Sequence, residues 1–152
     1  MAEDTADTTA ENDALADALA AEHAAVWGYG VVGAALGSRE RATAAAAETA
    51  HRDVRDRLTT LLTERGLDAA GPRGGYTLPF PVLSAIDAAA LGATLEDGVA
   101  SAWVRVLDQA GERPTRELAV EVLGGAEVRA VGWRAAAGKN PTTRALPGLP
   151  AG

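Results

Sequence analysis

The sequence predicts an all-α protein, built as a four-helix bundle of two antiparallel helical hairpins joined by a long crossover. Apolar residues recur at alternating steps of three and four along four stretches of the 152-residue chain, which is the spacing of one helical face. The links between these stretches are short, long and short, in that order. A single core is expected, because a chain of about 150 residues buries roughly two-thirds of its unfolded surface.

The first hairpin is predicted from two apolar seams and a short turn. Thr8 and Glu11 are spaced as a capping box ahead of the first helix, which runs to the turn at Gly37. Ser38 can cap the second helix, and Gly66 should end it, because glycine readily adopts the left-handed conformation of helix ends. A turn this short makes the two helices antiparallel neighbours. The seam residues of the first helix are Leu15, Leu19, Glu22, Val26, Tyr29, Gly33 and Leu36, and those of the second helix are Ala44, Ala47, His51, Val54, Leu58, Leu61 and Arg65.

The second hairpin follows from the same signals. Ser84 and Asp87 are spaced as a capping box for the third helix. This helix should end at Gly111, and Pro114 should open the fourth. The fourth helix has two competing apolar stripes, so it is expected to be buried on more than one side. The third seam reads Val82, Ile86, Ala89, Ala93, Glu96, Ala100, Trp103 and Leu107; the stripes of the fourth helix are Val120, Leu123, Glu127 and Val131, against Leu118, Val122 and Val128.

The long link between the hairpins covers about residues 66–83. It can extend about 60 Å, whereas a helix of about 26 residues is about 39 Å long. The link can therefore run the full length of the bundle, as the crossover of ferritin-like bundles does. Tyr76, Leu78 and Phe80 are expected to lie on the core, so a packed crossover is favoured over a groove for a peptide or a second chain.

Composition and charge limit the class of protein. The folded domain is predicted over residues 11–137, between a disordered acidic N-terminus (1–10) and a flexible tail rich in glycine and proline (138–152). The acidic start is unlike a signal peptide, and no run is apolar enough to span a membrane, so a cytoplasmic protein without a membrane partner is expected. A net charge of −7 without a basic stripe argues against a nucleic-acid partner.

Carboxylates interrupt three of the four apolar seams, at Glu22, Glu96 and Glu127. The remaining helix offers Glu48 and His51, which lie three apart on one helical face. A carboxylate-bridged pair of metal ions needs one Glu from each of two helices and a Glu-x-x-His from each of the others. Because the chain has no cysteine, these five residues are the predicted metal ligands. Iron, manganese and zinc are the candidate ions.

Several stretches resemble a known family. They are residues 21–30, 51–56 and 76–82, together with Leu95-Glu96 and Ala102-Trp103. Over about residues 12–137 the chain resembles the ferritin-like family catalogued as domain of unknown function 4439. The resemblance implies a ferritin-like bundle with an ancestry among di-iron proteins, and it brings no established activity with it.

The predicted fourth helix departs from the wider ferritin and bacterioferritin pattern. Those proteins have a second Glu-x-x-His there, whereas this chain has Ala130 three residues after Glu127. His23 cannot replace the missing ligand, because it points about 100° away from Glu22 around the helix. If no metal is bound, a buried glutamate must pair with an arginine or a histidine, or stay protonated and donate a hydrogen bond, since an unpaired buried charge is too costly. Glu22, Glu48 and Glu96 around His51 are expected to form such a network.

The leading hypothesis is a ferritin-like bundle of unknown biochemical role, whose degenerate carboxylate/histidine centre binds metal weakly or not at all. Two alternatives stay open. One is a metal-dependent oxidoreductase of the di-iron type, or an iron-handling protein. The other is a non-enzymatic interaction module that forms a homodimer, by analogy with other ferritin-like bundles. The aromatic residues are expected to serve packing, and the helical glycines close contact between helices. These aromatic residues are Trp27, Tyr29, Trp103 and Trp133.

Overall fold

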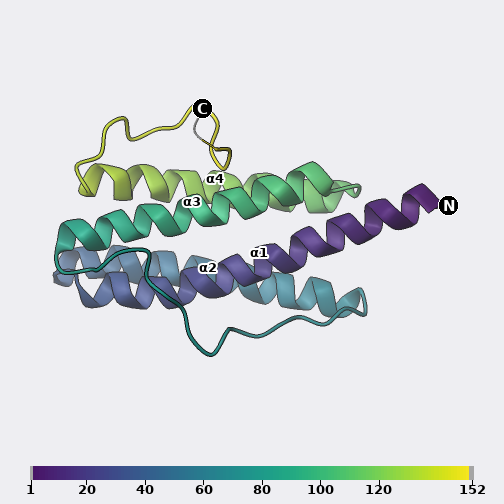
Figure 1. Cartoon of the computed structure of the whole chain (residues 1–152), viewed down its shortest axis with the longest axis horizontal. Helices are drawn as coiled ribbons and strands as arrows, with labels where there is room; N and C mark the ends of the chain where they lie inside the picture. Colours follow the sequence, from purple (N-terminus) through teal and green to yellow (C-terminus); the bar gives the residue numbers. More distant parts are fainter. Residues whose placement is uncertain (1, 151–152) are drawn as a thin grey trace.

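The computed structural model describes residues 2–150, with side chains over residues 8–150. These residues form α1 (Ala2–Ala34), α2 (Ser38–Glu64), α3 (Ala85–Gln109) and α4 (Arg113–Ala136). The helices lie along a common direction (Figure 1), so the prediction of an all-α four-helix bundle is confirmed. Helix α1 includes residues 2–10, where the sequence predicts a disordered N-terminus.

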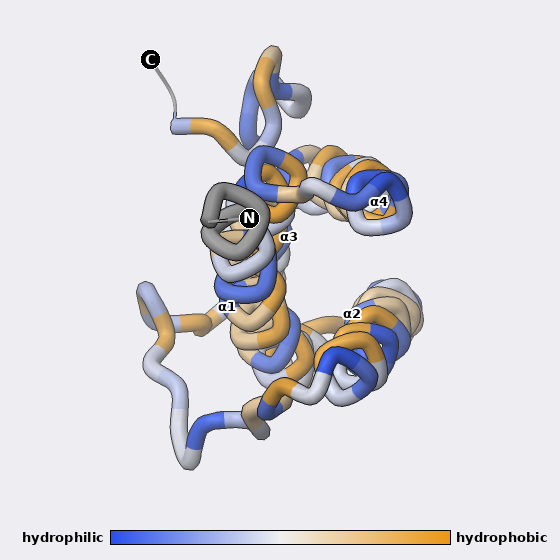
Figure 2. The backbone as a smooth tube through the Cα atoms, turned by 90° about the vertical axis from the view of Figure 1, so that its right-hand side faces the viewer, coloured by the Kyte–Doolittle hydropathy of each residue, from blue (hydrophilic) through white to orange (hydrophobic). Residues whose placement is uncertain are grey.

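The helices form two hairpins joined by an extended link. Helix α1 packs against both α2 and α3, and α3 packs against α4. The view along the bundle shows α2 and α4 as separate flanks of the α1–α3 pair (Figure 2). Two pockets, of about 680 and 590 Å³, lie between α2 and α4. The link between α2 and α3 is as long as the sequence predicted, and it returns the chain along the outside of the bundle (Figure 1).

The helix ends from α2 to α4 follow local sequence signals, with one exception. Gly66 has a φ of +72° directly after α2, which confirms it as the left-handed end of that helix. Ser84 caps α3, because its hydroxyl oxygen accepts a hydrogen bond from the Asp87 amide at 3.1 Å. The exception is the start of α2, where Ser38 is already helical and Gly37 occupies the cap position without a side-chain bond. The prediction of a Ser38 cap is therefore wrong.

Apolar side chains fill the core in two clusters along the bundle. One surrounds the fully buried Trp103 and includes Leu15 and Leu58. The other surrounds Tyr29 and Trp133. Helix α3 approaches α4 closely at Gly92, where an added Cβ would lie 2.8 Å from the Trp133 ring. This contact is possible because glycine has no side chain there.

The crossover lies on the second cluster through alternate residues. Leu78, Phe80 and Val82 pack against the cluster. These alternate residues share one side of the segment, because successive residues of an extended segment point to opposite sides. Their contact with the core confirms the predicted packed crossover. The outward side includes Leu83, which is 87% exposed. Two residues before Leu78, Tyr76 packs on Trp27, with ring centroids 5.4 Å apart.

Helix α4 does not bury either predicted stripe in full. Its buried apolar residues are Ala119, Val122, Ala126, Ala130 and Trp133. Val120 and Val128, taken from the two predicted stripes, are 57% and 75% exposed. Small alanines thus set the face of α4 that meets the bundle.

The segment after α4 folds back on the bundle (Figure 1). The carbonyl of Thr142 accepts a hydrogen bond from Arg134 of α4 at 2.8 Å. Arg144 forms an ion pair with Asp97 of α3 at 3.0 Å. The tail therefore has specific contacts with both helices of the second hairpin. Within residues 2–150, no helix has the length and apolar character needed to cross a membrane.

Candidate functional site

Three buried side chains from three helices meet in the middle of the bundle. Glu22 of α1, His51 of α2 and Glu96 of α3 are each 0% exposed. His51 Nδ1 lies 2.6 Å from Glu22 Oε2, and its Nε2 lies 3.1 Å from Glu96 Oε1. The imidazole thus bridges two carboxylates, and it can donate to both only when it is protonated. Trp103 Nε1 donates a further hydrogen bond to Glu22 Oε1 at 2.8 Å.

The second carboxylate, Glu96, receives donors from α1 and α4 as well. Arg129 Nε donates to Glu96 Oε1 at 2.8 Å, and the Tyr29 hydroxyl donates to the same oxygen. Trp133 Nε1 donates in turn to the Tyr29 oxygen at 2.7 Å. All four helices are therefore joined by one chain of hydrogen bonds. We call this group the polar centre: Glu22, Tyr29, His51, Glu96, Trp103, Arg129 and Trp133.

The charges of the polar centre compensate one another. Burial acts to lower the pKa of His51, but hydrogen bonds and charges from Glu22 and Glu96 outweigh it and raise that pKa to about 9. Burial acts to raise the pKa of Glu96, but His51 and Arg129 hold it below its usual value. Burial and the adjacent Glu96 charge raise the pKa of Tyr29, so its hydroxyl stays neutral and donates. Two carboxylates thus face two cations.

This arrangement does not fit a two-metal site. Three of the four carboxylate oxygens already accept hydrogen bonds from indole, imidazole, hydroxyl or guanidinium groups. Arg129 also places a positive charge beside Glu96, where a metal ion would be repelled. The remaining oxygen, Glu96 Oε2, is buried and has no hydrogen-bond partner among the described residues. Over the described part of the chain, no group of three or more His, Asp and Glu side chains is placed to hold a metal ion.

The other two predicted ligands lie away from the polar centre. Glu48 accepts a hydrogen bond from Arg52, one turn further along α2, at 2.5 Å. Its side chain is 25% exposed, so solvent and a surface partner stabilise its charge. Glu127 pairs with Arg134 of its own helix at 2.8 Å. Of the five predicted ligands, the structure therefore brings together Glu22, His51 and Glu96, and not Glu48 or Glu127.

Sequence reasoning missed the hydrogen bonds that close the polar centre. Tyr29, Trp103 and Trp133 were expected only to fill space, and each also supplies a polar hydrogen to the centre. Arg129 was not singled out at all. A weak signal for it exists, because Arg129 lies between the alanines at positions 126 and 130 that face the bundle.

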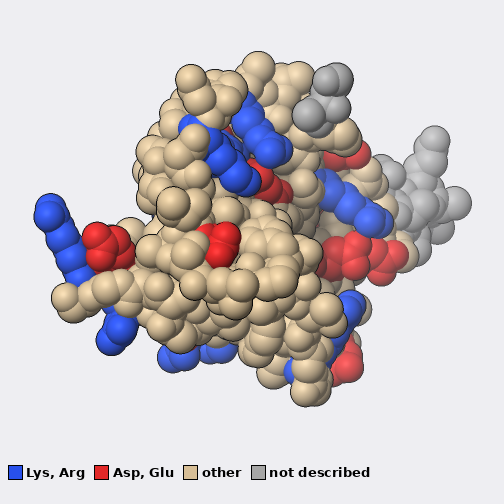
Figure 3. Space-filling model, turned by 60° about the vertical axis from the view of Figure 1, so that its left-hand side comes forward, with Lys and Arg blue, Asp and Glu red and all other residues tan. Residues whose placement is uncertain are grey.

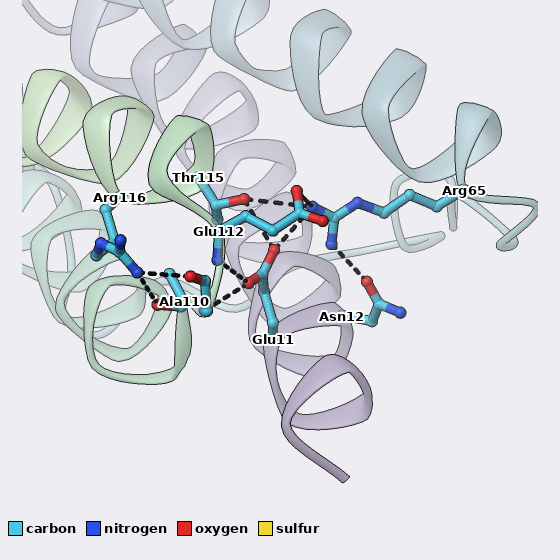
Figure 4. A network of polar contacts seen from close by, with 8 residues as sticks. Glu11, Asn12, Arg65, Ala110, Glu112, Thr115 and Arg116 are labelled. Atoms are coloured by element: carbon cyan, nitrogen blue, oxygen red, sulfur yellow. Dashed lines mark hydrogen bonds and ion pairs between the residues drawn. The ribbon is translucent and has the colours of Figure 1, made fainter. Parts of the chain in front are cut away.

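A third buried carboxylate ties the far end of the bundle together (Figure 4). Glu11 of α1 is 3% exposed, and its Oε1 accepts from Arg65 at 2.7 Å and from Thr115 at 2.8 Å. Its Oε2 accepts from the backbone amides of Gly111 and Glu112 at 2.7 and 3.2 Å. Glu11 therefore lies inside α1 and anchors the turn between α3 and α4, instead of capping a helix that starts after it.

Comparison with known proteins agrees with this architecture. A family model described as Domain of unknown function (DUF4439) matches residues 14–151. The crystal structure of the conserved hypothetical protein Rv2844 from Mycobacterium tuberculosis superposes with a TM-score of 0.81 at 38% sequence identity, covering 84% of this chain and 96% of that one. No curated protein matches the chain. The match over most of its length shows that the chain belongs to the DUF4439 family.

Proposed function

We propose that this chain is a non-enzymatic helical module of ferritin-like ancestry that pairs with a second copy of itself. In this proposal the polar centre replaces an ancestral metal site. The observation that carries the proposal is the bridge formed by His51 between Glu22 and Glu96, with Arg129 as a second cation. Buried charges that compensate one another need no metal to stay charged. The buried glutamates on α1 and α3, and the crossover, support the ancestry.

Access to the polar centre also favours a structural role. A substrate would have to reach Glu22, His51 or Glu96, and all three are 0% exposed. The nearby pocket of about 590 Å³ between α2 and α4 is lined by Arg129 and Trp133 of the polar centre, and by none of these three residues. A reaction at the carboxylates would therefore require the helices to separate.

An apolar surface at the start of α3 supports pairing with a second copy. Leu83 is 87% exposed and Ile86 is 63% exposed, next to the exposed Pro79 and Pro81 of the crossover. Figure 3 faces the end of the bundle where α3 begins, and charged side chains are widely spaced over the lower half of this view. Large apolar residues grouped on a surface often mark an interface. A two-fold axis would place this patch against itself, as closed dimers require.

Sedimentation equilibrium tests the proposed dimer. We expect the wild-type chain to form a dimer at micromolar concentration. Ile86→Glu should weaken the dimer at least tenfold, because the interface would then bury two negative charges, one from each copy, facing each other. Val120→Glu is the matched control, since Val120 is also more than half exposed but lies on α4. A wild-type chain that remains monomeric at about 100 µM would contradict the proposal, as would equal weakening by both variants.

The metal-dependent alternative makes a different demand on the structure. An oxidoreductase or iron-handling centre built on the five predicted ligands requires Glu48 and Glu127 to leave Arg52 and Arg134 and to turn inward. Iron binding that is lost on changing His51 would favour this alternative. The dimer measurement is independent of that outcome.

A further inference from the structure

A pocket outside the polar centre lies between the C-terminal tail and the second hairpin. Its volume is about 400 Å³. Asp97 of α3 and Arg134 of α4 line its inner side, and residues of the tail between 139 and 144 line its outer side. In Figure 3, positive and negative side chains gather in the upper part of the view.

Positive charges outnumber negative charges around this pocket. Arg134 is only 3% exposed and pairs with both Asp97 and Glu127, at 2.5 and 2.8 Å. Arg144 of the tail makes a second ion pair with Asp97 at 3.0 Å. The two acids are therefore shared between two arginines. Lys139, the only lysine of the chain, also lines the pocket, and its ammonium group has no acidic partner among the described residues. One positive charge remains in excess.

The pocket also presents hydrogen-bond donors that lack protein acceptors. Over residues 8–150, neither the Lys139 ammonium nor the Asn140 amide nor the Thr143 hydroxyl forms a hydrogen bond to another residue, and all three line the pocket. The Nε of Arg134 is buried without an acceptor. The acidic oxygens of the pocket are already engaged by arginines. A ligand that completes this site must therefore supply acceptors and a negative charge.

We propose that this pocket binds a small oxyanion of the phosphate type, held by Lys139, Asn140 and Thr143 of the tail beside Arg134 and Arg144. A phosphate group offers several acceptor oxygens to donors that converge from different directions. The partial negative charge at the C-terminal end of α4 opposes an anion. The positive charges of Arg134 and Lys139, at the same end of the helix, offset it. Binding would also fasten the tail to α3 and α4.

The unique lysine gives a direct test on the full chain. Lys139 Nζ and the α-amino group are the two kinds of amine that an N-hydroxysuccinimide acetate reagent can label. We expect 10 mM inorganic phosphate to slow acetylation of Lys139 at least threefold relative to sodium chloride of equal ionic strength, with the α-amino rate unchanged. Peptide mass spectrometry of timed samples measures both rates in one experiment, so the α-amino group is the internal control.

Two variants separate binding from loosening of the tail. Thr143→Ala removes one pocket donor and leaves the contacts of Thr142 and Arg144 with the helices in place, so it should reduce the protection of Lys139 without changing its labelling rate in chloride. Arg105→Gln is the control, because Arg105 pairs with Asp17 at the surface and does not line the pocket; protection should persist. Equal protection by sulfate would support an oxyanion site. Equal Lys139 labelling in phosphate and chloride would overturn the proposal, and so would full protection in Thr143→Ala together with equal slowing of the α-amino group.

Discussion

The charge on His51 makes the stability of this protein sensitive to alkaline pH. Its pKa is about 9 in the folded chain, against 6.5 for an unperturbed histidine. A difference of about 2.5 units, at about 1.4 kcal/mol per unit, corresponds to about 3–4 kcal/mol of folding free energy. Because the folded state holds the proton more tightly, this stabilisation is complete below pH 6.5. The stabilisation falls as the pH rises from 6.5 to about 9, and it is lost above about pH 9.

Urea unfolding followed by far-ultraviolet circular dichroism measures this dependence at each pH from 6 to 10. The free energy of unfolding should decline most steeply between about pH 7 and 9, approaching 1.4 kcal/mol per pH unit. His51→Gln should be less stable at pH 6.5 and should lack this decline. His23→Gln is the matched control, because His23 contacts the Ala70 carbonyl outside the polar centre, at 3.0 Å. A wild-type stability that is flat from pH 6.5 to 9.5, or a decline that persists in His51→Gln, would refute the reasoning.

Two further perturbations test the packing at Gly92 and the buried carboxylate of Glu11, both by urea unfolding. Gly92→Ala should destabilise the chain by about 1–3 kcal/mol, because its Cβ would press on the Trp133 ring. The control is Gly98→Ala, in open space on the same helix, which should stabilise the chain by about 0.5–1 kcal/mol. Identical effects of the two changes on stability would contradict the contact between Gly92 and Trp133. Glu11→Gln should cost about 2 kcal/mol, because a buried carboxylate loses charge-assisted bonds from Arg65 and the Gly111 amide. Asp17→Asn, which breaks an exposed ion pair, should change stability by less than about 0.5 kcal/mol, and a loss as large as that of Glu11→Gln would argue against a special role for the buried site.

The sequence was sufficient for the fold because three seams carry strong signals. Large apolar residues such as Leu15, Leu19 and Leu58 repeat at helical spacing and are buried as expected. Glu22 and His51 interrupt these seams near mid-helix, so their convergence followed from the same spacing. The length of the crossover then fixed which helix ends meet.

The fourth helix was harder to place because its buried face is made of small residues. Alanines such as Ala119, Ala126 and Ala130 add little apolar contrast to a sequence pattern, whereas the exposed Val120 and Val128 add more. The face of α4 that packs on the bundle is therefore rotated relative to the predicted stripe, and Glu127 lies at the side of the bundle. Such a rotation is decided by close packing between helices, which a sequence pattern does not record.

Glu48 illustrates a different limit. Its spacing from His51 is compatible with a shared face, but residues three apart still differ by about 60° around a helix. Arg52 lies one turn away and offers Glu48 a charged partner without the cost of burial. Which of two acceptable partners a long side chain chooses depends on solvent access, and this information is present only in the folded structure.

Metal analysis tests most directly whether the polar centre is closed by hydrogen bonds. The purified full chain is loaded with Fe(II) without oxygen, desalted, and measured by plasma mass spectrometry beside His51→Ala. We predict less than about a tenth of an equivalent of iron per chain in both proteins, because Arg129, His51 and Trp103 already engage three of the four carboxylate oxygens. Two irons per chain in the wild type, lost in His51→Ala, would contradict the account and establish the centre as a metal site.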